Sequence, residues 1–235
     1  MRQGMTGKTR TAVLRNAMTE ESARAMIEAK KTGAFRALMR APRKEDVHVH
    51  SVKLVHEALI RVSARYSADF FRKAVHPIKV DQNVIEVVLG DGVFPIRSKS
   101  RIHKTLSAGL GKNRVDLELE EHVFAESEGM MCLDRHGGET DFPYKTGPGA
   151  VEPYPRRILD ASENVRSPEV ETEEALSKLK EKLRGPPPDG MRDLREEFAA
   201  KAVEVVYVPV YESRLVGPKK KVRMMRIDAA RKKIL

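Results

Sequence analysis

Two short clusters carry the residue types that metal or acid–base chemistry uses. His48 and His50 would project from one face of a strand, and Cys132, Asp134 and His136 would share a face if their segment is extended. A zinc site needs three or four ligands in a tetrahedral array, and the chain contains neither a CxxC nor an HExxH spacing. We therefore rank a metal-dependent enzyme third among the functions considered.

A catalytic interpretation of the second cluster lacks the groups that would complete it. Asp134 and His136 could form an acid–base pair beside the glycines that follow, but no nucleophile or substrate pocket can be identified with them. Cys132 follows Met130 and Met131, and this apolar context favours a buried small hydrophobic residue over a reactive thiol. Dinucleotide, kinase and hydrolase signatures are absent from the sequence. We expect no catalytic residue, no metal and no cofactor.

Positive charge is concentrated in three windows of the chain. The net charge is +10, yet residues 1–19 contain four bases and no acid, and residues 92–115 contain six bases and no acid. Residues 213–235 contain nine bases and the single acid Asp228, so the rest of the chain is negative. Segregation of this kind is what an anion-binding surface requires. A solvated surface with basic tails would share the same pattern.

Composition limits the class of protein. The 235 residues suffice for one sizeable core or two small ones. A single cysteine excludes an intrachain disulfide and is typical of a reducing compartment, so we expect a cytoplasmic protein. No apolar run approaches the roughly 20 residues that span a bilayer, so we expect no membrane partner.

Helical spacing of apolar residues predicts three packing helices. They are expected near residues 19–40, 172–184 and 190–201. Thr19 and Thr172 are suitable N-caps, each followed by acids in the first turn. The second helix should end at Gly185 and the three prolines after it, and Asp189 should cap the third.

Two Val-rich segments resemble each other and suggest an internal duplication. Residues 52–55 (VKLV) match 203–206 (VEVV), and residues 78–81 (IKVD) match 225–228 (MRID). We therefore predict an α+β fold in which two diverged antiparallel β-meander repeats share a core, with the helices covering one side. The first meander should turn at residues 66–73. Chance similarity between two β segments is the alternative.

Period-two patterns predict further strands. Residues 84–89 should form a strand that a turn at Gly90–Gly92 connects to residues 93–96, and residues 115–119 alternate apolar and acidic side chains as a half-buried strand does.

The chain is expected to fall into four segments. Residues 1–18 should be a mobile basic arm, and residues 19–136 should hold a helix, the first meander and the following strand. Residues 137–169 are rich in proline and glycine and should form an extended connection. Residues 170–235 should hold two helices and the second meander. They could also form one compact domain with residues 19–136.

The candidate binding site lies at the two predicted hairpin tips and in the basic loop between residues 97 and 114. Basic hairpins can neutralise backbone phosphates, and aromatic rings can stack on unpaired bases. The candidate nucleic-acid-binding residues are Arg65, Tyr66, Arg72, Lys73, Arg97, Lys99, Arg101, Lys104, Lys219, Lys220, Lys221 and Arg223. Lysines beside a turn can also serve only to keep a sheet edge soluble and unpaired.

These patterns favour a non-catalytic binding protein that engages nucleic acid, DNA or RNA, or a ribonucleoprotein surface. The alternative is a protein–protein adaptor or assembly subunit that docks through residues 137–169 and exposed strand edges.

Overall fold

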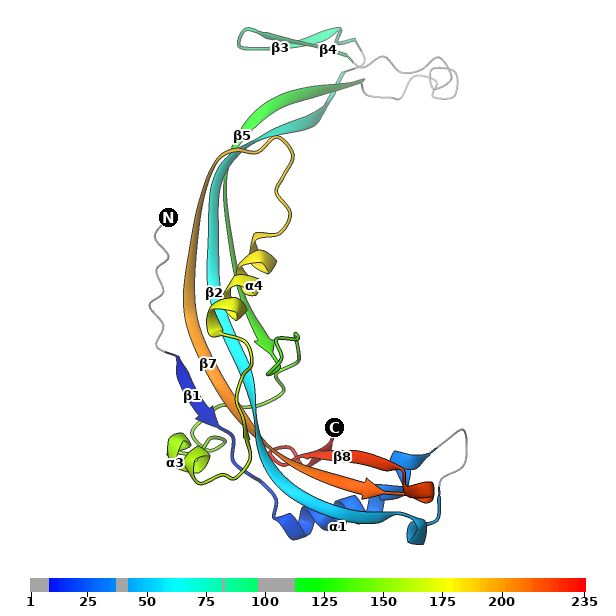
Figure 1. Ribbon diagram of the computed structural model, residues 1–235. Coiled ribbons are helices and arrows are strands. Elements are labelled where there is room, and N and C mark those ends of the chain that lie inside the picture. The colour runs from blue at the N-terminus through cyan, green and yellow to red at the C-terminus, as the bar shows by residue number, and fades with distance from the viewer. Residues whose placement is uncertain (1–8, 37–41, 82, 97–112) are drawn as a thin grey trace. The chain divides into compact units, whose positions relative to one another are not determined.

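The computed structural model describes residues 9–36, 42–81, 83–96 and 113–235, and it divides into two compact units (Figure 1). Unit 1 contains Met1–Arg65, Glu128–Leu183 and Phe198–Leu235. Unit 2 contains Tyr66–Ser127 and Arg184–Glu197. Each unit therefore takes residues from both sides of the proline-rich segment 137–169.

Strands outnumber helices, and most of them belong to one mixed, mainly antiparallel sheet. The order across it is β5 (Asn113–Leu133), β2 (His48–Val80), β7 (Arg192–Val216), β8 (Val222–Asp228) and β9 (Lys233–Ile234). Two short strands join in parallel, β1 (Arg10–Val13) beside β7 and β6 (Val165–Arg166) beside β2. The predicted α+β class is confirmed.

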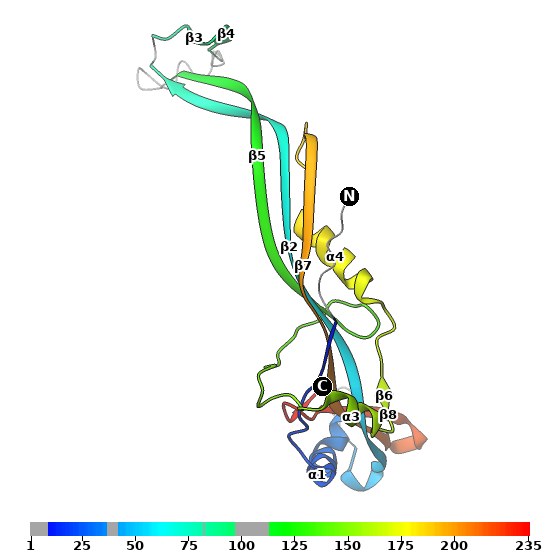
Figure 2. The same cartoon turned by 90° about the vertical axis from the view of Figure 1, so that its left-hand side faces the viewer.

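One face of β2 in unit 1 forms the core under α4 (Thr172–Arg184). Ile60, Val62 and Ala64 are fully buried, while the residues between them are partly exposed, as the period of two predicts. Leu176 and Leu179 of α4 pack against them, and Figure 1 and Figure 2 both show the helix beside β2 and β7. The predicted helix at 172–184 is confirmed.

A second core in unit 1 lies beneath α1 (Glu20–Lys30). Ile27 of this helix is fully buried and packs against Leu215 and Ile227 of the β7–β8 hairpin. Thr19 caps the helix, since its Oγ1 accepts a hydrogen bond from the Ser22 N–H at 3.2 Å.

The predicted helix at 19–40 is shorter than expected. After α1 the chain continues as a 3₁₀ helix, η1 (Lys31–Phe35), and Arg36 is already extended with φ −62° and ψ 124°. The reason is local. Gly33 lowers helix propensity, and the Arg36 N–H donates to the Gly33 carbonyl at 3.2 Å, a 3₁₀-type bond that ends the helix. Residues 37–41 lie outside the described part of the chain.

The predicted helix at 190–201 is wrong, because β7 begins at Arg192 and runs through this segment. Leu194 and Phe198 are four residues apart, a spacing that fits one face of a strand as well as one face of a helix. Pairing with β2 supplies the backbone hydrogen bonds, so the sheet overrides local helix propensity.

The predicted hairpin turn at 66–73 is also wrong, because β2 is one strand from His48 to Val80. Tyr66, Ala68 and Phe70 continue the buried alternation of β2 without a break. The segment 66–73 holds no Gly, Pro or Asn to support a tight turn. The first copy of the suggested repeat is therefore not a meander, and the two-repeat architecture is not found.

Part of the predicted mobile arm, residues 1–18, is an ordered strand. β1 pairs with β7 from Arg10 opposite Glu204 to Val13 opposite Tyr207, and both Val13 and Leu14 are buried. The short apolar run at residues 12–14 gains more from burial than from remaining in solvent. Residues 1–8 lie outside the described part.

The proline-rich segment 137–169 belongs to unit 1 and packs on its strands. The Glu152 N–H donates to the carbonyl of Val13 at 2.8 Å, and Phe142 and Tyr144 pack against buried residues of β1 and β7. A short helix, α3 (Pro155–Asp160), and β6 belong to this segment.

Unit 2 contains an isolated hairpin made of β3 (Glu86–Leu89) and β4 (Gly92–Pro95). Gly90 has φ 58°, a value that suits glycine at a turn, so the predicted turn and the strand before it are confirmed. The predicted strand at 115–119 is part of the longer β5. Among the described residues, no helix is long and apolar enough to cross a membrane.

Candidate functional site

The β7–β8 hairpin ends in a basic turn. The two strands pair from Val210 opposite Asp228 to Val216 opposite Val222, and the turn is closed by the Gly217 N–H, which donates to the Lys221 carbonyl at 2.8 Å. We call Lys219, Lys220, Lys221 and Arg223 the basic tip. All four side chains are exposed. The predicted turn at Gly217 and Pro218 is confirmed.

Two residues of the basic tip have an unfavourable backbone conformation. Lys219 has φ 57° and ψ 30°, and Lys220 has φ 58°. The central residues of a type I′ hairpin turn have such values, and Asn and Gly are usual there because side chains with a Cβ are strained. The strain is of order 1 kcal/mol or more for each such residue. Two lysines therefore occupy positions at which other residues would be more stable.

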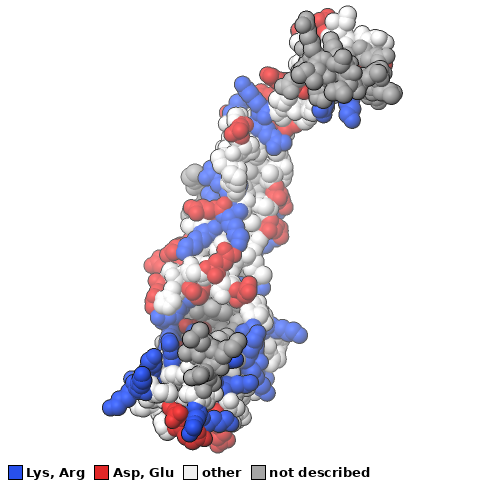
Figure 3. All heavy atoms as spheres, turned by 90° about the vertical axis from the view of Figure 1, so that its right-hand side faces the viewer, with Lys and Arg blue, Asp and Glu red and all other residues white. Residues whose placement is uncertain are grey.

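The charges of the basic tip are not neutralised by neighbours in the described ranges. No ion pair joins any of its four residues to another described residue. Phe35 packs directly on Gly217, where an added Cβ would lie 2.6 Å from the Phe35 Cε1 atom. That contact places the exposed Arg36, the next residue in the chain, near the turn. Figure 3 shows Lys and Arg side chains gathered toward the lower end of the view, where Figure 1 draws α1 and β8.

Among the other predicted binding residues, those that the structure describes do not form a second basic tip. Arg72 donates from Nε to Glu121 Oε2 at 2.8 Å, and Lys73 lies in the field of the Glu120 carboxylate. Arg65 is exposed on β2 in unit 1 and lies in the field of the Glu128 carboxylate.

Tyr66 is buried and therefore offers no stacking surface. Its hydroxyl donates to Glu196 Oε1 at 2.8 Å, and burial raises the pKa of Tyr66 to about 12. Phe70 is buried as well, and Phe71 stacks on His122 with its ring centroid 4.5 Å away. The four remaining predicted residues, Arg97, Lys99, Arg101 and Lys104, lie outside the described part.

The excess of positive over negative charge lies in unit 1. Its sequence contains 32 Lys and Arg against 21 Asp and Glu, whereas unit 2 contains 12 against 13. The basic tip is thus part of the unit that carries all of the net positive charge. This concentration is what association with a polyanion requires.

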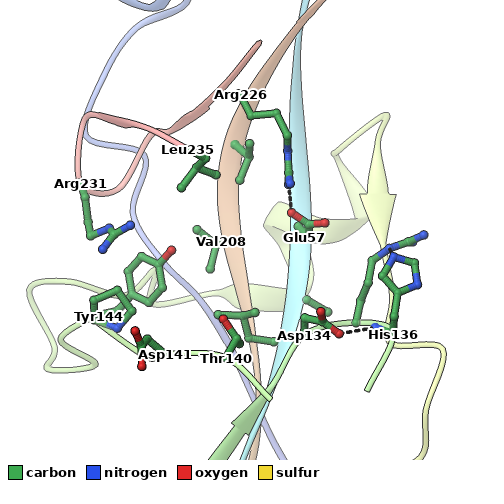
Figure 4. Close-up of a pocket in the computed structure, with 15 residues that line it drawn as sticks. Glu57, Asp134, His136, Thr140, Asp141, Tyr144, Val208, Arg226, Arg231 and Leu235 are labelled. Carbon is green, nitrogen blue, oxygen red and sulfur yellow. Dashed lines mark hydrogen bonds and ion pairs between the residues drawn. The ribbon is translucent and has the colours of Figure 1, made fainter. Parts of the chain in front are cut away.

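A cavity of about 460 Å³ is the second candidate site in unit 1 (Figure 4). Its apolar floor is formed by residues of β2 and β7, namely Ala58, Leu59, Val208 and Val210. The charged rim is formed by Glu57, Asp134, Arg135, His136, Asp141, Arg226 and Arg231. A cavity of this size could hold a small ligand, so the partners of its rim charges matter.

Ion pairs within the protein occupy most of this rim. Arg226 pairs with Glu57, and its Nε also lies 3.0 Å from a Glu212 oxygen. Arg231 donates from Nε to Asp228 Oδ2 at 2.6 Å, and the same oxygen accepts the Tyr144 hydroxyl at 2.8 Å. These contacts fix the turn that follows β8. They favour a structural role over ligand binding.

Asp134 and His136 do not form the acid–base pair considered from the sequence. Asp134 Oδ1 accepts the backbone N–H groups of His136 at 2.9 Å and Gly138 at 2.8 Å, so the carboxylate holds a local turn. The His136 Nδ1 atom faces Glu169 Oε2 at 2.7 Å. Cys132 is buried, and burial raises its thiol pKa to about 11, which keeps the sulfur protonated.

The metal interpretation gains no support from the geometry. Within residues 9–36, 42–81, 83–96 and 113–235, no group of three His, Cys, Asp or Glu side chains could hold a metal ion. His48 and His50 are both exposed on β2.

The position of Arg36 near the hairpin turn was not predicted from the sequence, since only the contact between Phe35 and Gly217 brings it there. No local pattern records such a long-range contact. Comparison with protein-family models, with curated proteins and with solved structures finds no match for this chain.

Proposed function

We propose that this chain is a non-catalytic binding protein that holds the phosphate backbone of a nucleic acid with the basic tip. The observation that carries the proposal is the turn itself. Three consecutive lysines are exposed, they make no ion pair with a described residue, and two of them have left-handed backbone. Conformational strain that persists in a fold often accompanies function.

The chemistry of the tip suits phosphate contacts more than base recognition. Ammonium groups act as point charges that neutralise phosphates and release condensed counterions. Among the described residues, the Phe35 ring lies against the turn, and it is partly buried on Gly217. The proposed binding is therefore independent of sequence, and a ribonucleoprotein surface would offer the same phosphates as free DNA or RNA.

Solubility alone explains the tip less well. Lysines beside a turn discourage edge-to-edge association of strands. That purpose is served by Lys221 and Arg223, which do not need a positive φ. Lys219 and Lys220 add strain that a purely solubilising charge could avoid.

The test is a charge reversal compared with a matched control. The variant Lys219→Glu, Lys220→Glu, Lys221→Glu should lose at least about tenfold in affinity for a fluorescently labelled 25-nucleotide probe at 50 mM salt, because phosphate contacts are replaced by repulsion. Fluorescence anisotropy measures the affinity, with DNA and RNA probes in parallel.

The control reverses Lys53, Lys145 and Lys233, which are exposed and have no ion pair with a described residue. It changes the net charge equally and should lose no more than a few-fold in affinity. Equal losses in the two variants would show that net charge, and not the tip, determines binding.

A further inference from the structure

Exposed apolar side chains are concentrated in unit 2. Of the thirteen large hydrophobic residues that the described chain exposes, eight lie in this smaller unit. Four belong to the β3–β4 hairpin or its start, with exposed fractions of 83% for Ile85, 63% for Val88, 54% for Leu89 and 57% for Val93. A two-stranded hairpin is marginally stable by itself, and a further strand would stabilise it.

The backbone register shows which edge of the hairpin can accept another strand. The Ile96 N–H donates to the Ile85 carbonyl at 3.3 Å, so these opposite residues direct their backbone groups into the hairpin. Because hydrogen-bonded and non-bonded pairs alternate, Glu86 and Val88 direct theirs outward from β3. No described strand pairs with that outer edge.

The outer edge of β4 is protected by its sequence. Val93 lies opposite Val88, and Pro95 lies opposite Glu86, so both direct their backbone outward from β4. Proline has no N–H, and edge strands commonly use it to prevent pairing. On the outer edge of β3, both outward-facing residues, Glu86 and Val88, have an N–H group. On the outer edge of β4, only Val93 has one, because Pro95 has none.

We propose that the outer edge of β3 pairs with β3 of a second copy of this chain, in antiparallel orientation about a twofold axis at Val87. This register places Glu86 opposite Val88 of the second copy and Ile85 beside Leu89 of the second copy. It covers Ile85, the most exposed large apolar residue in the described part of the chain, with an apolar partner. The two hairpins form one four-stranded sheet.

Charge selects this register over its neighbour. Centring the axis on Glu86 would place two carboxylates directly opposite each other, which is destabilising in a sheet. A lipid surface is a poorer occupant, because the hairpin turn carries the exposed Asp91, and this carboxylate would enter the membrane first. The interface is small, so the dimer is weak and depends on concentration.

A pair of proline variants tests the edge. Sedimentation velocity of the full chain from about 1 to 200 μM, a range suited to a small interface, should show a monomer–dimer equilibrium. Val88→Pro removes an outward N–H of β3 and should raise the dimer dissociation constant roughly tenfold or more, because two hydrogen bonds across the axis are lost. The matched control Val93→Pro removes the outward N–H of β4 at the opposite position and should leave the dimer unchanged.

A cysteine variant tests the register without weakening the hairpin. In the proposed dimer the two Val87 residues form a non-hydrogen-bonded pair, with Cα atoms roughly 4.5 Å apart, which a disulfide can bridge. Val87→Cys should therefore form a covalent dimer under mild oxidation, and the buried Cys132 should not compete. The control Val93→Cys, at a position that is more exposed than Val87, should stay monomeric on gels. A chain that remains monomeric at 200 μM, a dimer that Val88→Pro does not weaken, or equal cross-linking of the two cysteine variants would overturn the proposal.

Discussion

At Lys219 and Lys220, the backbone conformation and the charge of the side chain favour different residue types. Their positive φ values favour Asn and Gly, whereas their exposure and lack of ion pairs with described residues favour a charged ligand. Stability and binding should therefore respond in opposite directions when the two lysines are replaced.

The double variant Lys219→Asn, Lys220→Gly should gain about 1–2 kcal/mol in the free energy of unfolding, because both residues then suit a type I′ turn. It should also lose affinity for the nucleic-acid probe, since two cations are removed. Urea denaturation and fluorescence anisotropy measure the two effects. A variant that is less stable than the natural chain would contradict the assigned turn strain.

Asp228 illustrates a residue whose role is structural. It is fully buried, and its carboxylate accepts hydrogen bonds from the Tyr144 hydroxyl, the Arg231 guanidinium and the N–H groups of Ala230 and Arg231. Asp228→Asn should cost about 2–4 kcal/mol of unfolding free energy, because Arg231 loses its charged partner beside a buried amide. Asp141→Asn on the same cavity, where the carboxylate is exposed, should cost less than about 0.5 kcal/mol. Similar urea midpoints for the two variants would refute this assignment.

At the scale of elements, alternation and helical spacing predicted some of the strands and helices and missed others. Alternation predicted residues 115–119 of β5, and the helical spacing of Leu176, Leu179 and Leu183 predicted α4. The errors arose where one spacing fits two structures: Leu194 and Phe198 suit a helix or a strand, and only pairing with β2 decides between them. The continuation of β2 through Tyr66 likewise depends on partner strands that are distant in sequence.

The contact between η1 and the hairpin turn gives a prediction at this scale. Gly217→Ala should lower the unfolding free energy by about 1–3 kcal/mol, because the new methyl group would lie within 3 Å of the Phe35 ring. Gly147→Ala is the matched control, since nothing lies within 4 Å of its added Cβ. Thermal or urea unfolding compares them. If the two variants lose equal stability, η1 does not pack on the turn as described.

For the whole molecule, the sequence predicted segregated charge but not its assignment to units. The basic windows at 1–19 and 213–235 both belong to unit 1, which is assembled from three separate parts of the chain. The predicted basic tip at Lys219–Lys221 was found from local turn chemistry, whereas its neighbour Arg36 was not, because a tertiary contact brings it there. Arg72 and Tyr66 are held instead by carboxylates from β5 and β7, which no short-range pattern reveals.

The salt dependence of nucleic-acid binding tests the central claim most directly. The affinity of the full chain for a duplex probe should fall linearly with salt on a double-logarithmic plot between 50 and 200 mM, with a slope of about −3 to −5 if four or five cations contact phosphates. The Lys219→Glu, Lys220→Glu, Lys221→Glu variant should reduce the magnitude of that slope by about 2–3, one unit for each lost contact. Absence of binding at 50 mM salt, or a slope that the variant leaves unchanged, would contradict the account.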